Sequence, residues 1–127
     1  MKAGAAGHII GRKAETLACD YLREKDYRII CRNYRSTYGE IDIVAAQQSV
    51  LVFVEVRYKK RGSLLTPQES VSRAKVRRLK LAVRDFLYKH SGILRHYDCI
   101  RVDLVCASES GEPPSLEFNI VKGIIEF

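Results

Sequence analysis

The chain has 127 residues, 46% of them hydrophobic and 29% charged, and a formal net charge of +7. This length suits one domain with a single core, so we expect one domain over residues 1–127, with residues 1–7 flexible. No apolar run approaches the ~20 residues that cross a bilayer, and the N-terminal segment lacks the apolar centre of a signal peptide. These features exclude a membrane protein and favour the cytoplasm. The positive charge favours a polyanionic partner, nucleic acid before an acidic membrane.

The first predicted element is a helix from about Ile9 to Lys25. Glu15 lies beside its apolar stripe, where a solvated surface glutamate is the ordinary interpretation. An acid near a metal is the alternative, if a metal site is found close by. The stripe follows the helical spacing and consists of Ala14, Leu17, Ala18, Tyr21 and Leu22.

A strand is predicted next, over Tyr27–Ser36, followed by a β-hairpin over residues 39–58. The strand carries three arginines, which either face solvent or follow a phosphate backbone. The hairpin turns at Gln48 and Ser49, so that the numbers of facing residues sum to 97. One face of the hairpin is then wholly apolar: Ile41, Ile43, Ala45, Val52, Val54 and Val56.

The other face of the hairpin becomes charged at its open end. In this register Asp42 faces Glu55, and Glu40 faces Arg57. Two carboxylates opposed across a strand pair are destabilising unless a cation, a shared proton or a guanidinium compensates. With Arg57 two residues after Glu55, the pattern has the form D…ExK with arginine in the lysine position. Such a site can hold a divalent cation and hydrolyse a phosphodiester bond.

A second helix is predicted from Thr66 to about His90. Thr66 and Glu69 form a capping box, and Pro67 occupies the first helical position. Its core side comprises Val71, Leu79, Ala82, Val83, Phe86 and Leu87. A basic stripe, with Lys75 and Arg78 beside it, is either a solubilising face or a phosphate-binding surface; its members are Arg73, Arg77, Lys80 and Arg84.

Two further strands are predicted, over Tyr97–Ala107 and Leu116–Val121. Asp103 is either an ion-pair partner of Arg101 or a support for the site, and the ion pair is the ordinary interpretation. The cysteines have no CxxC spacing, and the histidines form no cluster with them. We therefore expect reduced thiols and no zinc site. The order of elements predicts a mixed sheet flanked by helices.

These motifs together resemble the YraN family of small bacterial proteins over nearly the whole chain. The resemblance is carried by Gly11 to Leu22, by GEIDIV at residues 39–44, by VFVEVRY at residues 52–58, by the helix that contains Lys75, and by RVDLV at residues 101–105. It implies an α/β, restriction-endonuclease-like fold with about five strands, similar to archaeal Holliday-junction resolvases. By position it implies a PD-(D/E)xK-type site with Asp42 and Glu55 as metal ligands, Glu15 as a helix-borne acid, and Arg57 in the place of the motif lysine.

The combined expectation is a Mg²⁺- or Mn²⁺-dependent endonuclease acting on DNA rather than RNA, including branched or recombination DNA. Asp42, Glu55, Arg57 and Glu15 would be catalytic, and Lys59 could substitute for Arg57 because guanidinium cannot act as a base. The phosphate-binding set would be Arg73, Lys75, Arg77, Lys80, Arg84 and Lys59. One alternative is a non-catalytic nucleic-acid-binding module. Another is a protein-interaction subunit whose carboxylates are neutralised by Arg57 and Arg101. Resolvase-like relatives act as dimers, so a homodimer is an alternative to a monomer.

Overall fold

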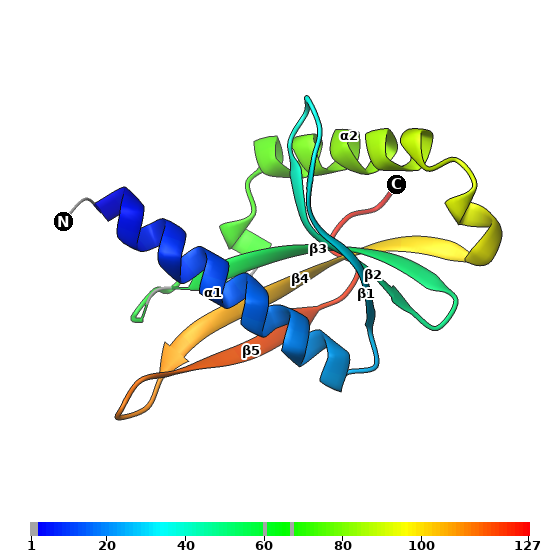
Figure 1. Ribbon diagram of the computed structural model, residues 1–127. Coiled ribbons are helices and arrows are strands. Elements are labelled where there is room, and N and C mark those ends of the chain that lie inside the picture. The colour runs from blue at the N-terminus through cyan, green and yellow to red at the C-terminus, as the bar shows by residue number, and fades with distance from the viewer. Residues whose placement is uncertain (1–2, 60, 67) are drawn as a thin grey trace.

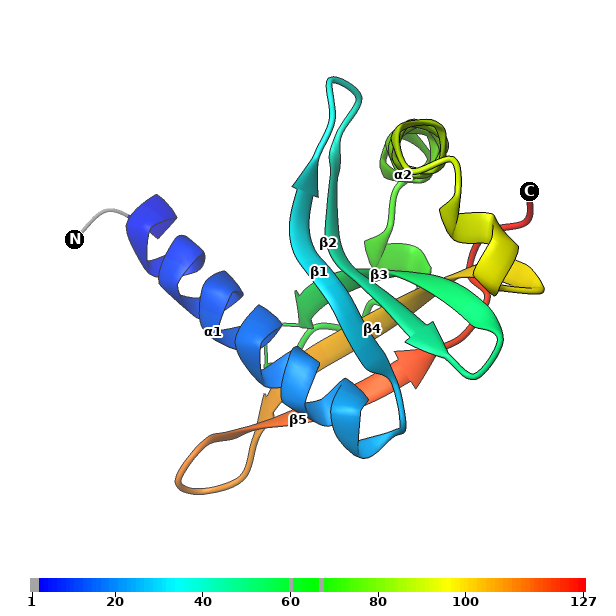
Figure 2. The same ribbon diagram turned by 45° about the vertical axis from the view of Figure 1, so that its right-hand side comes forward.

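The protein is a three-layered sandwich, in which one helix covers each face of a five-stranded sheet (Figures 1 and 2). The computed structural model describes residues 3–59, 61–66 and 68–127, and side chains from Lys13 onward. Its main elements are α1 (Ala3–Glu24), β1 (Arg28–Arg35), β2 (Glu40–Gln47), β3 (Val50–Lys59), α2 (Arg73–Lys89), β4 (Cys99–Ser110) and β5 (Ser115–Val121). The predicted α/β architecture is confirmed and is consistent with a restriction-endonuclease-like fold.

The strands lie in sequence order across the sheet, β1-β2-β3-β4-β5. Only the β3–β4 pair is parallel, and α2 lies in the connection between these two strands. This is expected, because parallel neighbours need a long crossover whereas antiparallel ones are joined by short turns. The predicted hairpin register is confirmed from Gln47, which pairs with Val50, to Ile43, which pairs with Val54. The predicted pairing of Glu40 with Arg57 was wrong, because Glu40 pairs with Arg35 of β1 instead. Gln48 has a φ of +51° in the tight turn between β2 and β3.

Helix α1 packs on one face of the sheet through the predicted apolar stripe. Ala18 and Leu22 are buried against Val52 and Val54 of β3. The helix begins at Ala3, so residues 3–7, expected to be a flexible end, belong to it. Ile9, the predicted start, lies well inside the helix.

Helix α2 packs on the opposite face. Phe86 meets the ring of Phe53 edge to face, with ring centroids 5.5 Å apart. Ile41 also joins this cluster, although the alternation along β2 predicted that it would lie with Ile43 on the other face. The physical reason is twist: β1 carries a bulge between Ile29 and Cys31, and bulges increase the local right-handed twist of a strand pair.

The second helix starts later than predicted. Thr66 and Glu69 do form the reciprocal capping bonds, at 3.0 and 3.2 Å, but they cap a 3-10 turn over Gln68–Ser70. The α-helix itself begins at Arg73 with Ser72 as its N-cap. Val71 therefore precedes α2, and Pro67, predicted at the first helical position, lies outside the described residues.

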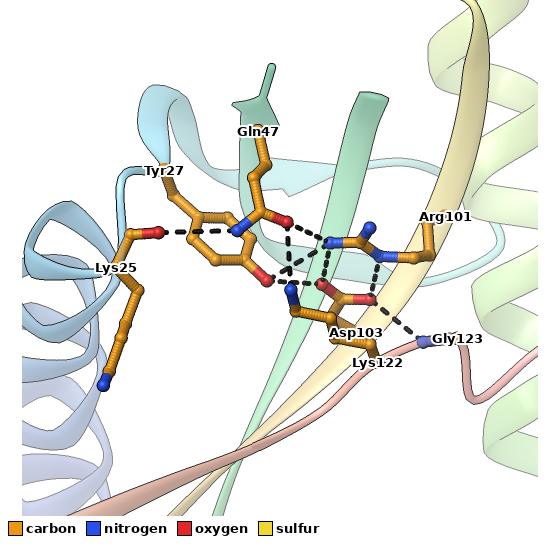
Figure 3. Close-up of polar contacts among 7 residues, drawn as sticks. All are labelled: Lys25, Tyr27, Gln47, Arg101, Asp103, Lys122 and Gly123. Atoms are coloured by element: carbon orange, nitrogen blue, oxygen red, sulfur yellow. Dashed lines mark hydrogen bonds and ion pairs between the residues drawn. The ribbon is translucent and has the colours of Figure 1, made fainter. Parts of the chain in front are cut away.

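A polar network on the α1 face of the sheet fixes Asp103, which is completely buried (Figure 3). Arg101 donates to both carboxylate oxygens, at 2.7 and 2.8 Å, and Tyr27 donates to the carboxylate at 2.8 Å. The amide of Gly123 donates a fourth bond, at 3.0 Å. Burial, together with the Asp103 carboxylate, raises the pKa of Tyr27, which keeps its hydroxyl protonated and donating. The ion-pair interpretation of Asp103 is confirmed.

Gln47, at the end of β2, extends this network to two other segments. Its side-chain oxygen accepts from Arg101 at 2.8 Å and from Lys122 at 3.3 Å, and its nitrogen donates to the carbonyl of Lys25 at 3.4 Å (Figure 3). The side chain of Gln47, beside the β2–β3 turn, thus connects the end of α1 with the segment after β5.

The C-terminal segment crosses from the edge of the sheet to the α2 face. Gly123 has a φ of +67°, which suits glycine, and it starts the crossing. The amide of Ile124 then donates to the carbonyl of Val102 at 2.9 Å. Ile125 is buried in the cluster under α2. Ile125 is therefore part of the core, although Phe127 after it is exposed.

All four cysteines are free thiols, as predicted. In the part of the chain that the structure describes, no helix is long and apolar enough to cross a membrane.

Candidate functional site

Strands β2 and β3 separate where the predicted acidic pair begins. Of the described residues in these strands, Ile43 and Val54 are the last pair before the separation. Beyond them β2 stays paired only with β1, and β3 only with β4. Figures 1 and 2 show the β1–β2 hairpin rising away from the sheet, between α1 and α2. Asp42 and Glu55 are the first residues of the two arms of this fork.

Asp42 spans the fork instead of simply facing Glu55. Its Oδ2 accepts a hydrogen bond from the backbone amide of Val56 at 2.8 Å, and the residue is only 9% exposed. Burial raises the pKa of Asp42, while the Val56 bond and the nearby Lys75 lower it. The side chain takes the place of a ladder hydrogen bond that the separated strands no longer make.

Glu55 is more deeply buried, at 3% exposure. Its Oε2 lies 3.4 Å from the ammonium nitrogen of Lys75 in α2, which makes an ion pair, but the two groups are not aligned for a hydrogen bond. Burial and the neighbouring Asp42 raise the pKa of Glu55 to about 8, against Lys75 and Arg57, which lower it. The Asp42 and Glu55 carboxyl groups therefore lie close enough to repel each other, although the strands that carry them are not paired at this point.

Glu15 brings a third carboxyl group from α1. Burial first, then Asp42 and Glu40, raise the pKa of Glu15 to about 7, and Arg32 opposes them. With its amide nitrogen turned toward the acids, Asn33 donates to Glu15 at 3.1 Å and to Glu40 at 3.0 Å. Asn33 adopts a φ of +54°, a conformation that asparagine tolerates better than most residues. The structure thus brings the helix-borne acid to Asp42.

Arg57 and Lys59 point into a neighbouring cavity of about 310 Å³. Thr66 and the buried Cys106 also line this cavity. Arg57 still lowers the pKa of Glu55, but it contributes less than Lys75 does. Both cations are thus held on the same side of the sheet as the carboxyl groups.

The basic stripe of α2 faces outward. Arg73, Arg77 and Arg84 are exposed and Lys80 is half-buried. In the described part of the chain, none of the four forms an ion pair with a carboxylate. Their charge is therefore available to a polyanion.

The other proposed neutraliser, Arg101, is bound to Asp103 on the opposite face of the sheet. It does not neutralise Asp42 or Glu55. This removes one of the two cations on which the protein-interaction alternative depended.

The donor set fits a hard divalent cation. Mg²⁺ and Mn²⁺ prefer carboxylate oxygens. Glu55 Oε2 is a buried oxygen without a hydrogen bond, and the pKa values of Glu15 and Glu55 are raised by burial and then by repulsion, which a cation would relieve. Among the side chains that the structure describes, however, no three His, Cys, Asp or Glu residues are already arranged to hold a metal. Coordination would therefore need a small movement of the carboxyl groups, oxygens from the substrate, or both.

Two members of this site could not be assigned from the sequence alone. Asn33 carries no motif, and its only signal is the tolerance of asparagine for a positive φ. Lys75 was predicted to bind nucleic acid beside the basic stripe, and its position against Glu55 depends on where α2 begins.

The mixed five-stranded sheet with a helix on each face is consistent with a restriction-endonuclease-like fold. The chain belongs to the uncharacterised protein family UPF0102, whose family model matches residues 14–107. This confirms the predicted membership of the YraN family. The matched region contains Glu15, Asp42, Glu55 and Arg57 of the site.

Relatives from several bacteria match most of the chain. A UPF0102 protein of Anaeromyxobacter dehalogenans is 37% identical over 122 residues, which cover 92% of this chain and 89% of the relative. One from Carboxydothermus hydrogenoformans is 45% identical over 96 residues, covering 76% and 79%. A third, from Coxiella burnetii, is 40% identical over 96 residues, covering 76% and 78%. Their names state no activity.

Proposed function

We propose that this protein is a Mg²⁺- or Mn²⁺-dependent nuclease that hydrolyses DNA phosphodiester bonds, including those of branched or recombination DNA. The observation that carries the proposal is the neighbourhood of Asp42, where Glu15 approaches from one side and Glu55, with Lys75 and Arg57 near it, from the other. Structural acids are rarely buried together at a cost in mutual repulsion, and such clusters are typical of functional sites.

Asp42 and Glu55 would hold the cation, with Glu15 on its α1 side. A bound divalent cation polarises a phosphoryl oxygen and lowers the pKa of a bound water. The oxygen of the attacking water forms a bond to phosphorus, the bond from phosphorus to the leaving oxygen breaks, and a proton passes to the leaving oxygen. Arg57 and Lys59 supply fixed positive charge for the phosphate.

Substrate binding is assigned to the outward face of α2. Arg73, Arg77, Lys80 and Arg84 lie on the helix that also presents Lys75 to the carboxyl groups. A strand whose phosphates follow this stripe is thereby led toward the fork. The net charge of +7 supports the same assignment.

A non-catalytic DNA-binding module is the second candidate, favoured by one observation. Arg57 stands where the motif has lysine, and its side chain lines the cavity beside Lys59. Such a module would bind DNA through the same stripe without cutting it. A homodimer and a cytoplasmic location also remain predictions.

The test is cleavage of linear, flapped and four-way DNA with Mg²⁺ or Mn²⁺, by wild type and by Asp42→Asn. A matched control is Asp20→Asn, which changes an exposed carboxylate on α1. We expect metal-dependent cutting by wild type and the control, and none by Asp42→Asn. Equal cutting by all three proteins would contradict the site. DNA binding without cutting by wild type would support the second candidate.

A further inference from the structure

Lys75 differs from the other cations of α2 in what it contacts. It lies in the first turn of the helix, where its backbone amide donates to the Ser72 side chain at 3.1 Å. Its ammonium lies 3.4 Å from Glu55 Oε2, and its side chain is 24% exposed. Arg77 and Arg84, in contrast, point into solvent. Lys75 is directed into the candidate site.

The position of Lys75 is fixed by the helix start. The Ser72 cap sets the point where the helical backbone begins, and the side chain of N3 follows from it. The second turn of α2 also contacts the β1–β2 hairpin: a Cβ on Gly39 would lie 3.4 Å from that of Arg78. The Lys75–Glu55 ion pair therefore joins elements that pack together independently of it.

Arg57, which occupies the motif position, has a different environment. Its side chain lines the cavity with Lys59 and Cys106, and its influence on Glu55 is weaker than that of Lys75. A guanidinium is broad and planar, whereas an ammonium is a compact charge that fits between two carboxyl groups and a phosphate. The compact cation beside Glu55 is therefore Lys75, which belongs to α2.

We propose that Lys75 is a catalytic residue that takes the role of the motif lysine, with its ammonium pairing with Glu55 when that carboxyl group is ionised and contacting the scissile phosphate during cleavage. This inference rests on the proposed nuclease function. It also divides between two places the contacts that one motif residue would otherwise make. Lys75 would contact the reacting phosphate, and Arg57 and Lys59 would contact the neighbouring phosphates of the DNA strand.

The proposal makes a distinctive prediction for metal binding. An ammonium that pairs with Glu55 competes with a divalent cation for the same oxygen. Lys75→Met removes this charge and keeps much of the side-chain volume, so Mn²⁺ should bind on the order of tenfold more tightly. A lysine that only holds distant phosphates would not change the affinity for Mn²⁺.

The experiment compares Lys75→Met, Lys75→Arg and Lys80→Met with wild type. Lys80 is the matched control, because it is a lysine of the same helix on the basic stripe. Mn²⁺ affinity is measured by calorimetry, with and without uncleavable phosphorothioate DNA, and kcat and KM are measured on the preferred DNA. Thermal unfolding checks that each variant is folded, and Lys75→Arg provides a second variant if Lys75→Met is not.

For Lys75→Met we expect tighter Mn²⁺ binding, kcat lower on the order of 100-fold, and KM nearly unchanged. Lys75→Arg should restore the wild-type Mn²⁺ affinity and only part of kcat. Lys80→Met should raise KM and leave kcat unchanged.

Two results would overturn the inference in distinguishable ways. If Lys75→Met changes KM as Lys80→Met does, with Mn²⁺ affinity and kcat unchanged, then Lys75 is only a phosphate-binding residue and the nuclease proposal stands. If wild type binds no Mn²⁺ even with DNA present, both proposals fail together.

Discussion

The side chain of Asp42 and the backbone amide of Val56 form a hydrogen bond of 2.8 Å across the fork between β2 and β3. A carboxylate thus serves as a structural acceptor at the point where the strand ladder stops. Asp42 therefore has two separable tasks: satisfying a backbone donor and supplying negative charge.

Two substitutions at Asp42 separate these tasks. Asp42→Asn keeps an acceptor oxygen for Val56 and loses the charge, so stability should be retained and Mn²⁺ binding lost. Asp42→Ala leaves the amide without a partner, which destabilises the fold by about 1–3 kcal/mol. Urea denaturation measures the difference, and equal stability of the two variants would contradict the structural task.

Stability should fall as the pH rises through the range in which Glu55 ionises. The ordinary glutamate pKa is 4.5 and that of folded Glu55 is about 8, so between these values the folded state binds more protons than the unfolded state. Stabilisation is therefore fully present at low pH and lost as the pH approaches 8; Glu15, whose pKa is about 7, adds an effect of the same sign.

Glu55→Gln should flatten this dependence, because glutamine does not ionise. Urea denaturation at about pH 5 and about pH 8.5 compares wild type with Glu55→Gln and with Glu117→Gln, an exposed control on β5. The control should keep the wild-type slope. Identical pH slopes in wild type and Glu55→Gln would show that the fold does not raise the pKa of Glu55.

The basic stripe of α2 should determine the salt dependence of DNA binding. Replacing both Arg77 and Arg84 by Ala removes two exposed cations. The slope of log affinity against log salt should become shallower by about 0.9 for each phosphate that the protein no longer neutralises. The control pair is Arg28→Ala with Lys122→Ala, which removes the same charge from β1 and the segment after β5. If both pairs change the slope equally, net charge alone explains binding.

The Asp103 network should govern stability without affecting the candidate site. Asp103→Ala leaves the Arg101 guanidinium without a carboxylate partner and should destabilise the fold by about 3–5 kcal/mol. Tyr27→Phe removes the hydrogen bond that the hydroxyl donates to Asp103 and the one that it accepts from Arg101, and should destabilise the fold by about 2 kcal/mol. Mn²⁺ affinity, measured on the folded fraction by calorimetry, should stay at the wild-type value. A loss of affinity would show that the two faces of the sheet are coupled.

The features that could be predicted from the sequence are those with local or periodic signals. Alternation in β2 and β3, with a two-residue turn at Gln48 and Ser49, determined the register that places Asp42 and Glu55 together. Helical spacing placed Glu15 beside the buried stripe of α1. These signals arise from residues that are close together in the sequence, so they can be recognised without the structure.

The features that could not be predicted depend on contacts between distant segments. Beyond Ile43, β2 stays paired with β1 and no longer with β3, and no turn or bulge signal in the sequence near Asp42 indicates this separation. The capping box at Thr66 was correctly recognised, yet it caps a short 3-10 turn, and Ser72 starts the helix that positions Lys75. A shift of a few residues in a helix start changes which side chains point inward.

The burial of Ile125 under α2 has a practical consequence for anyone who expresses this protein. An affinity tag joined after Phe127, which is 58% exposed, leaves the crossing segment in place. A stop codon introduced at Gly123 would remove the Gly123 amide, which donates a hydrogen bond to Asp103. It would also remove the side chain of Ile125, which packs in the same cluster as Leu79 and Phe86. Proteolytic removal of this short segment would therefore take away contacts on both faces of the sheet.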